Sequence, residues 1–309
     1  MNSRYVLDSS EMMWFERQQE LVKTKVYEVE FPRLKARTLF PIDNSGGNWA
    51  NVVTYPQERM TGDAKIVNNY ADDFPRTDII NEEFSHGIHS LGASYGWSIQ
   101  DIRLAIKNGT NLQARKANSC KDAILRRENY IAFYGDSNQN IYGFLTEPNV
   151  PNIAVAADGT GSSPLWVDKT PDQIIRDITV LIKKIKVDTK DIEEADTLLL
   201  PVAQFSYLAS TRLDASIETT ILTWLGQQLR VQGITNIESV VELTGSGTGS
   251  TDQFVLYRRD PDKLVLNIPS DFEQFPVERK GMSFSVACHS RVGGIQFIRP
   301  LSAIKGYGI

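Results

Sequence analysis

The first hundred residues are dominated by alternation of polar and apolar side chains, a pattern that predicts extended chain and not helix. Residues 26–31 alternate along their length, and residues 84–88 and 91–97 repeat the pattern farther on. A polar stretch with prolines and glycines precedes those two segments. We therefore predict that residues 46–97 form a long two-stranded hairpin with a polar tip. A lone hairpin is only marginally stable in water, so we expect a neighbouring copy of the chain to support it.

Three stretches have the periodicity of a helix. Residues 98–134 begin with Ser98 and Asp101, three positions apart, which is the spacing of a capping box, and the pair Gly109-Thr110 marks an expected interruption. A second helix is expected to begin at Thr170-Pro171, because threonine is a favoured N-cap and proline a favoured first residue. Its apolar stripe runs on to Ile185. A third helix is predicted over roughly residues 214–230.

Strand-forming segments dominate the chain after Ile234. A short buried strand is also expected at 198–200, with a helix starting at Pro201, and Gly293-Gly294 is read as a hairpin turn. Because strands and helices do not alternate regularly, the pattern favours an α+β fold. The later strands are predicted at 237–243, 253–258, 263–268, 283–289 and 294–304.

The charge balance excludes a dedicated DNA-binding protein. The chain has 33 Lys and Arg against 38 Asp and Glu, giving a net charge of −5, whereas phosphate binding calls for a basic excess. The two cysteines are too few for a disulfide framework, so assembly in a reducing cytoplasm is expected. No secretory signal and no run of apolar residues long enough to span a membrane is visible.

Candidate chemistry is sparse, and no enzyme, metal or cofactor is expected. His86 and His89 lie three positions apart, which places them on opposite faces of a strand. Cys288 and His289 are adjacent, so their side chains also point apart. Residues 136–147 imitate a calcium loop, but Ile141 stands where that loop needs glycine. The glycine-rich loop 245–250 lacks the lysine of a phosphate loop.

Several motifs, in their order along the chain, resemble the major capsid proteins of tailed bacteriophages, which share the Hong Kong-type capsid fold. The resemblance covers residues 26–309 and includes Gly135-Asp136 at the end of the spine helix and the segment Thr170-Pro171-Asp172. One branch of these proteins is matched more closely still. The motifs that carry the resemblance lie at 135–145, 170–175, 198–208, 212–220, 259–262, 268–274, 288–294 and 299–306.

The resemblance implies a structural protein that forms pentamers and hexamers and closes into the icosahedral shell of a phage head. It also implies assembly in the cytoplasm of a bacterial host, a final location in the virion, and a shell that encloses double-stranded DNA without sequence-specific binding. Separate scaffolding, portal and decoration proteins are the implied partners. The alternative is an encapsulin-like compartment that stores a cargo enzyme. The implied regions are an N-terminal arm (1–45), an extended hairpin loop (46–97), a peripheral domain with the spine helix (98–167), an axial domain (168–270) and a C-terminal return to the peripheral-domain sheet (271–309).

The contacts between subunits are expected to come from aromatic and charged side chains of the hairpin. Lys65 lies near its tip, but matching Asn and Glu partners for a covalent crosslink are not identifiable, so crosslinking is not expected. The expected contact residues are Trp49, Tyr55, Arg59, Lys65, Tyr70, Asp72, Asp73 and Arg76.

Overall fold

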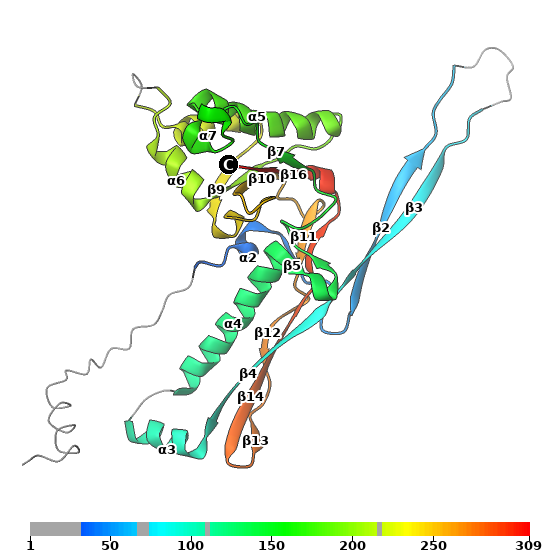
Figure 1. Cartoon of the computed structure of the whole chain (residues 1–309). Coiled ribbons are helices and arrows are strands. Elements are labelled where there is room, and N and C mark those ends of the chain that lie inside the picture. Colours follow the sequence, from blue (N-terminus) through cyan, green and yellow to red (C-terminus); the bar gives the residue numbers. More distant parts are fainter. Residues whose placement is uncertain (1–31, 67–73, 109–111, 215–217) are drawn as a thin grey trace, which may run out of the picture. The chain divides into compact units, whose positions relative to one another are not determined.

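The chain divides into two compact units, Met1–Arg33 and Leu34–Ile309. The second unit contains every helix and strand described below, and Figure 1 shows their order. The predicted strand at 26–31 lies outside the described residues. The computed structural model describes residues 32–66, 74–108, 112–214 and 218–309.

A five-stranded mixed sheet is covered on both faces. All residues of its two inner strands β8 and β10 are buried, so their apolar runs are continuous. Successive side chains of a strand point to opposite faces. Phe254 and Leu256 therefore lie in one hydrophobic core, and Val255 and Tyr257 lie in another. The strand order is β7 (Asn152–Ala154), β16 (Ala303–Tyr307), β10 (Gln253–Tyr257), β8 (Thr197–Pro201) and β9 (Asn236–Val240).

Three helices pack on one face of this sheet: α5 (Pro171–Asp188), α6 (Val202–Ser210) and α7 (Ile221–Val231). The predicted start of α5 is confirmed, because the Gln173 side chain accepts a hydrogen bond from the Thr170 backbone N–H at 2.8 Å. The predicted stripe of α5 is confirmed as well. Its buried members are Ile174, Ile178, Leu181, Ile182 and Ile185.

The third predicted helix begins later than expected. α7 starts at Ile221 and not near residue 214, because Thr220 adopts an extended backbone and accepts the N-cap hydrogen bond from the Thr223 N–H. Residues 215–217 lie outside the described part of the chain. The helix predicted from Pro201 is confirmed as α6.

Two helices, α3 (Ile99–Asn108) and α4 (Leu112–Tyr134), occupy the stretch predicted as a spine. The capping box is confirmed: the Ser98 hydroxyl accepts from the Asp101 N–H at 3.1 Å, and the Asp101 carboxylate accepts from the Ser98 N–H at 3.0 Å. α4 ends at Gly135, whose φ is +73°, and a Cβ there would meet the Ile141 carbonyl oxygen at 2.1 Å. The short strands β5 (Gly135–Asp136) and β6 (Ile141–Tyr142) pair across this turn.

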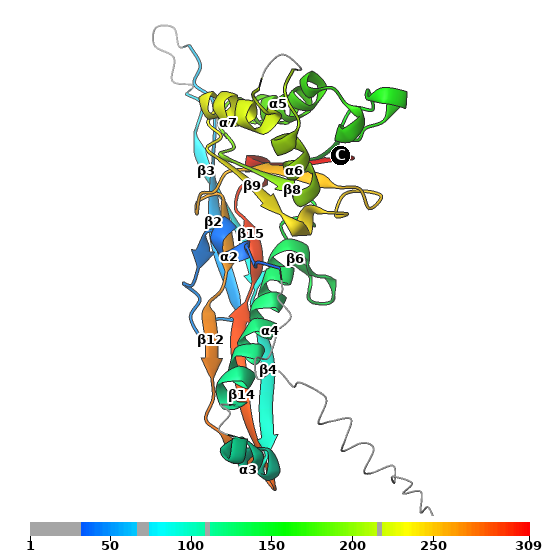
Figure 2. The same cartoon turned by 90° about the vertical axis from the view of Figure 1, so that its left-hand side faces the viewer.

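α4 packs against a second sheet whose central strand is β14 (Ser283–Val292), an arrangement visible in Figures 1 and 2. One edge of β14 pairs with β4 (His89–Ser98) along ten residues. The other edge pairs with β12 (Ser270–Gln274) and β13 (Glu278–Lys280). Neither β12 nor β13 was predicted, because most of their side chains are exposed and polar and carry no apolar alternation.

The hairpin consists of β2 (Val52–Thr61) and β3 (Asp78–Gly87), which pair in register along their whole length. The prediction that residues 46–97 form one hairpin is wrong in its extent. The chain leaves the hairpin at buried Ile88 and continues as β4 into the second sheet. An alternating pattern identifies a strand but does not identify its partner. No residue of β2 or β3 is fully buried.

The segment predicted as one strand at 294–304 is two strands, β15 (Gly294–Phe297) and β16, separated by a 3-10 turn at Pro300–Ser302. β15 pairs with β11 (Leu264–Asn267), which also pairs with β1 (Ile42–Asp43). The Gly293-Gly294 hairpin prediction is wrong, since β14 and β15 belong to different sheets. The segment 271–309 thus contributes strands to three sheets and not only to the sheet beside the spine helices.

The folded body begins before the predicted end of the arm at residue 45. Ala36, Leu39 and Phe40 are buried around the short helix α2 (Ala36–Leu39). The Tyr257 hydroxyl donates to the Leu39 carbonyl at 2.8 Å. These core contacts attach residues 34–43 to the body. The prolines on either side of α2 favoured the prediction of an extended arm.

The base of the hairpin docks onto the body through β2 and β3. The Tyr55 hydroxyl donates to the Phe297 carbonyl at 3.4 Å. His86 forms a hydrogen bond with the Gly293 backbone, and its buried Nε2 has no partner among the described residues. Burial lowers the pKa of His86, although Gly293 and the nearby Glu147 carboxylate oppose that shift.

A buried ion pair fixes the start of α5. The Lys169 side chain is fully buried, and its Nζ lies 2.6 Å from Asp177 and 3.3 Å from Asp158. Burial raises the pKa of Asp177, while Lys169 opposes the rise. Arg176 also contacts Asp158. Because charges removed from water need close partners, this cluster makes α5 depend on the chain before it.

Lys169→Met leaves the buried Asp177 without its closest cation. We expect the free energy of unfolding of the unassembled subunit to fall by about 3–5 kcal/mol, as measured by urea denaturation. The double variant Lys169→Met/Asp177→Leu removes both charges and should recover most of the loss. Equal stability of the single variant and the parent would contradict this account.

A histidine whose pKa is lowered by folding binds protons better in the unfolded chain, so His86 destabilises the folded subunit as the pH falls through 6.5. Replacing it by glutamine should therefore reduce the loss of stability between about pH 8 and 5, measured by denaturation at each pH. His89→Gln serves as the control. An unchanged pH profile for His86→Gln would refute the assignment.

Candidate assembly surface

The two faces of the hairpin differ in exposure because their side chains alternate. The inner face includes Val53, Tyr55 and Gln57 of β2, which are half-buried. The residues of β2 and β3 on the opposite face are all exposed. This outer face consists of Val52, Thr54, Pro56, Glu58 and Met60 with Ile79, Asn81, Glu83, Ser85 and Gly87.

Large apolar side chains gather toward the tip of the hairpin. Met60 is 82% exposed, Ile66 is 97% exposed and Phe74 is 66% exposed. Ile79 and Ile80 are also exposed. Burying one such side chain contributes about 1.5–3 kcal/mol, so this cluster favours a contact surface. The prediction from sequence omitted all five residues, although the adjacent isoleucines in an otherwise polar segment were a usable signal.

The expected contact residues have different environments. Trp49 is 84% exposed, and Arg59, Lys65 and Arg76 are exposed as well. Tyr55 instead stacks on Phe84, with ring centroids 5.5 Å apart, and contacts the body of its own chain. The other three, Tyr70, Asp72 and Asp73, lie outside the described residues.

A second exposed surface lies on α3 and the neighbouring end of the β14 sheet. Leu104 and Ile106 of α3 are 61% and 77% exposed, and Met282 is 71% exposed. The Ile99 N–H donates to the Met282 carbonyl at 3.1 Å, which joins α3 to this sheet. The segment 99–134 carries seven basic and three acidic residues, a net charge of +4.

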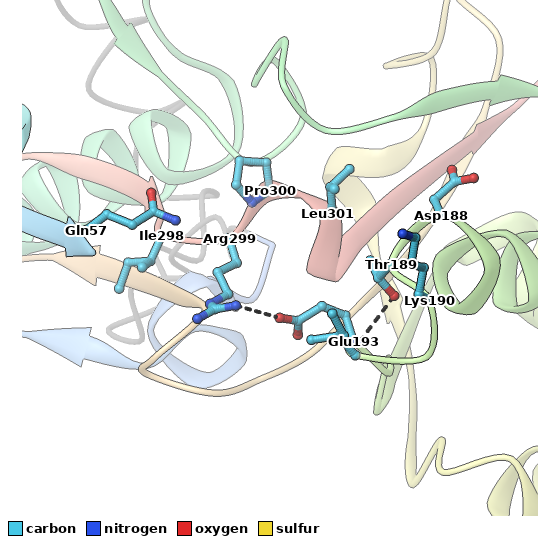
Figure 3. Close-up of a pocket in the computed structure, with 10 residues that line it drawn as sticks. Gln57, Asp188, Thr189, Lys190, Glu193, Ile298, Arg299, Pro300 and Leu301 are labelled. Atoms are coloured by element: carbon cyan, nitrogen blue, oxygen red, sulfur yellow. Dashed lines mark hydrogen bonds and ion pairs between the residues drawn. The ribbon is translucent and has the colours of Figure 1, made fainter. Parts of the chain in front are cut away.

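A pocket of about 430 Å³ lies between Gln57 of β2, the end of α5 and residues 298–301 (Figure 3). In its wall the Glu193 carboxylate lies 2.6 Å from Lys263 and 3.6 Å from Arg299. The second oxygen of Glu193 is buried and has no hydrogen-bond partner among the described residues. The pocket therefore lies between the hairpin base and the end of α5, which packs on the five-stranded sheet.

The residues considered for metal binding do not form a site in the part of the chain that the structure describes. His86 lies on β3 and His89 on β4, and the two strands belong to different sheets. Asp136 pairs with Arg127 at 2.5 Å, and Glu147 is buried beside Asn149. Within the described ranges, no group of three or more His, Cys, Asp or Glu side chains is arranged to hold a metal ion. No helix in those ranges has the length and apolarity needed to cross a membrane.

Comparisons with known proteins agree with this architecture. A family model described as "Major capsid protein" matches residues 62–309. No curated protein matches the chain. The structure of the capsid of Myoviridae phage XM1 is similar over 100% of both chains, with a TM-score of 0.82 and 18% identity. A Mycobacterium phage Cain structure matches over 98% of this chain and 97% of its own, with a TM-score of 0.63 and 10% identity.

The compartment alternative is not favoured by these comparisons. A virus-like particle from Pyrococcus furiosus is similar over 87% of this chain and 90% of its own, with a TM-score of 0.54 and 11% identity. These structural likenesses establish the shared fold, and the family match covers most of the sequence. The chain therefore belongs to the major capsid protein family, whose members build the head shells of phages.

Proposed function

We propose that copies of this chain assemble as pentamers and hexamers into the icosahedral head shell of a tailed phage, with the hairpin of each copy lying on a neighbour. The observation that carries the proposal is a hairpin with a complete backbone ladder and no fully buried residue. Such a ladder is only marginally stable without a surface to cover it. A closed symmetric lattice supplies that surface to every copy.

Charge complementarity favours α3 and α4 as the surface that receives the hairpin. Residues 52–87 contain seven acidic and three basic side chains, a net charge of −4, against +4 for residues 99–134. The outer face contributes Glu58 and Glu83, and α3 contributes exposed Arg103 and Lys107. Opposite charges across an interface speed association and fix the register of the partners.

The proposed function also assigns roles to the other parts of the chain and to its partners. Residues 168–270, together with β16, suit an axial domain that meets its copies around the five-fold and six-fold positions. We assign no catalytic role to the chain, and propose that a scaffolding protein and a portal act with it in the cytoplasm of the bacterial host. Decoration proteins would join the finished shell. The net charge of −5 suits a wall that encloses double-stranded DNA without binding it specifically.

Charge reversal tests the proposed contact. Glu58→Lys with Glu83→Lys should reduce the assembled fraction by roughly fivefold or more, since each copy loses two attractive contacts. Adding Arg103→Glu and Lys107→Glu in the same chain should restore assembly. Sedimentation velocity measures both fractions.

Asp262→Lys reverses one exposed charge outside β2 and β3 and is the control. A quadruple variant as defective as the double variant would count against α3 as the receiving surface.

Shortening the hairpin tests its role apart from its charge. Gln57 and Glu82 lie directly opposite each other, so an Asn-Gly turn can replace residues 58–81 and keep the base of the ladder. We expect a folded subunit with an unchanged melting temperature and no closed shells by electron microscopy. Normal shells from this variant would exclude the hairpin as a required contact.

A further inference from the structure

The chain has two cysteines in 309 residues, and the fold brings them together. Cys120 lies on α4 and Cys288 on β14, and each is buried with a free thiol. Both belong to one small apolar cluster with Ile124 and Val286. The Cys120 thiol lies close enough to Cys288 to contribute to the raised pKa of that residue.

The surrounding contacts hold α4 and β14 in a fixed register. Farther along the same two elements, the Ser290 hydroxyl donates to the buried Glu128 carboxylate at 2.5 Å. Beyond that, Ile131 packs with Val292. β14 is itself held between β4 on one edge and β12 with β13 on the other. The thiol contact is therefore part of a rigid helix-on-sheet interface.

We propose that Cys120 and Cys288 are an oxidation site, at which a small peroxide converts the contact into an intramolecular disulfide joining α4 to β14. One cysteine first loses its proton; the resulting thiolate attacks the peroxide oxygen and becomes a sulfenic acid, and the displaced hydroxide takes up that proton and leaves as water. The second thiol then attacks that sulfur, forms the S–S bond and releases a second water. Two thiols and one hydrogen peroxide thus give one disulfide and two waters.

The environment of the pair makes the first step of this oxidation slow. Burial raises the pKa of Cys288 to about 12, so this residue is a thiol and not the reactive thiolate at neutral pH. A reducing cytoplasm also maintains thiols during assembly. The time at which the disulfide forms rests on the proposed function. A phage head leaves the reducing cytoplasm when its host lyses, and oxidation follows that release. The bond would then close a long loop of chain and oppose unfolding of the shell protein.

The test uses the full-length unassembled subunit, so its result does not depend on whether shells form. The folded protein is incubated with hydrogen peroxide, denatured, alkylated and analysed by mass spectrometry without reduction. We expect a monomer lighter by about 2 Da, no alkylated cysteine, and a linked pair of peptides containing Cys120 and Cys288. The melting temperature should rise by roughly 5–10 °C over the reduced protein.

Two variants separate the disulfide from other effects of oxidation. Cys120→Ser and Cys288→Ala each remove one partner, and neither should show the peptide link or the rise in melting temperature. Each variant keeps one thiol and cannot form the disulfide. Either variant alone therefore tests the link if the other folds poorly. Two alkylated cysteines in the treated parent, or a disulfide that leaves the melting temperature unchanged, would overturn the proposal.

Discussion

The rest of the structure depends on one constraint. The β2–β3 hairpin is fully paired through its backbone, but its side chains form no hydrophobic core of their own. β2 and β3 satisfy each other's backbone hydrogen bonds, but exposed apolar and acidic side chains cover their outer face. The entropy lost in ordering such a long excursion is not offset by burial within the chain. The compact body anchors its base through Tyr55 and His86. Under the proposed function, a neighbouring copy covers the rest of the hairpin.

The body that the hairpin base contacts is closely packed. Its five-stranded sheet is buried on both faces, and the second sheet is covered by α4. Two polar clusters add to this packing. Arg37 pairs with Glu128 at 2.6 Å and with Asp271 at 2.8 Å, and Lys169 pairs with Asp177. The Arg37 contacts connect the start of the body to α4 and to β12, and the Lys169 contact connects α5 to the chain before it.

Local signals in the sequence predicted local structure well. The Ser98–Asp101 capping box, the Thr170-Pro171 helix start and the buried strand before Pro201 are all confirmed, because each depends on neighbours within a few residues. Partners distant in sequence could not be predicted in this way. The alternation at 91–97 identified a strand, but its pairing with β14 depends on residues almost 200 positions later. Gly293-Gly294 looked like a hairpin turn and instead passes the chain between sheets.

The candidate assembly surface shows the same difference between what local sequence predicts and what depends on distant residues. The order of motifs predicted the family, and the alternating pattern predicted the hairpin. The sequence did not reveal which side chains face outward, since that requires the register of β2 against β3 and the contact of the inner face with the body. The register places Met60 on the outer face, whereas the exposure of Ile66 and Phe74, which lie between the two strands, comes from the structure itself.

Electron cryo-microscopy of particles assembled from the full-length protein tests the central claim most directly. The account predicts closed shells of pentamers and hexamers in which the outer face of each hairpin lies against α3 and α4 of a neighbouring copy. Shells in which the hairpin contacts no neighbour, or a subunit that stays monomeric under all assembly conditions, would contradict it.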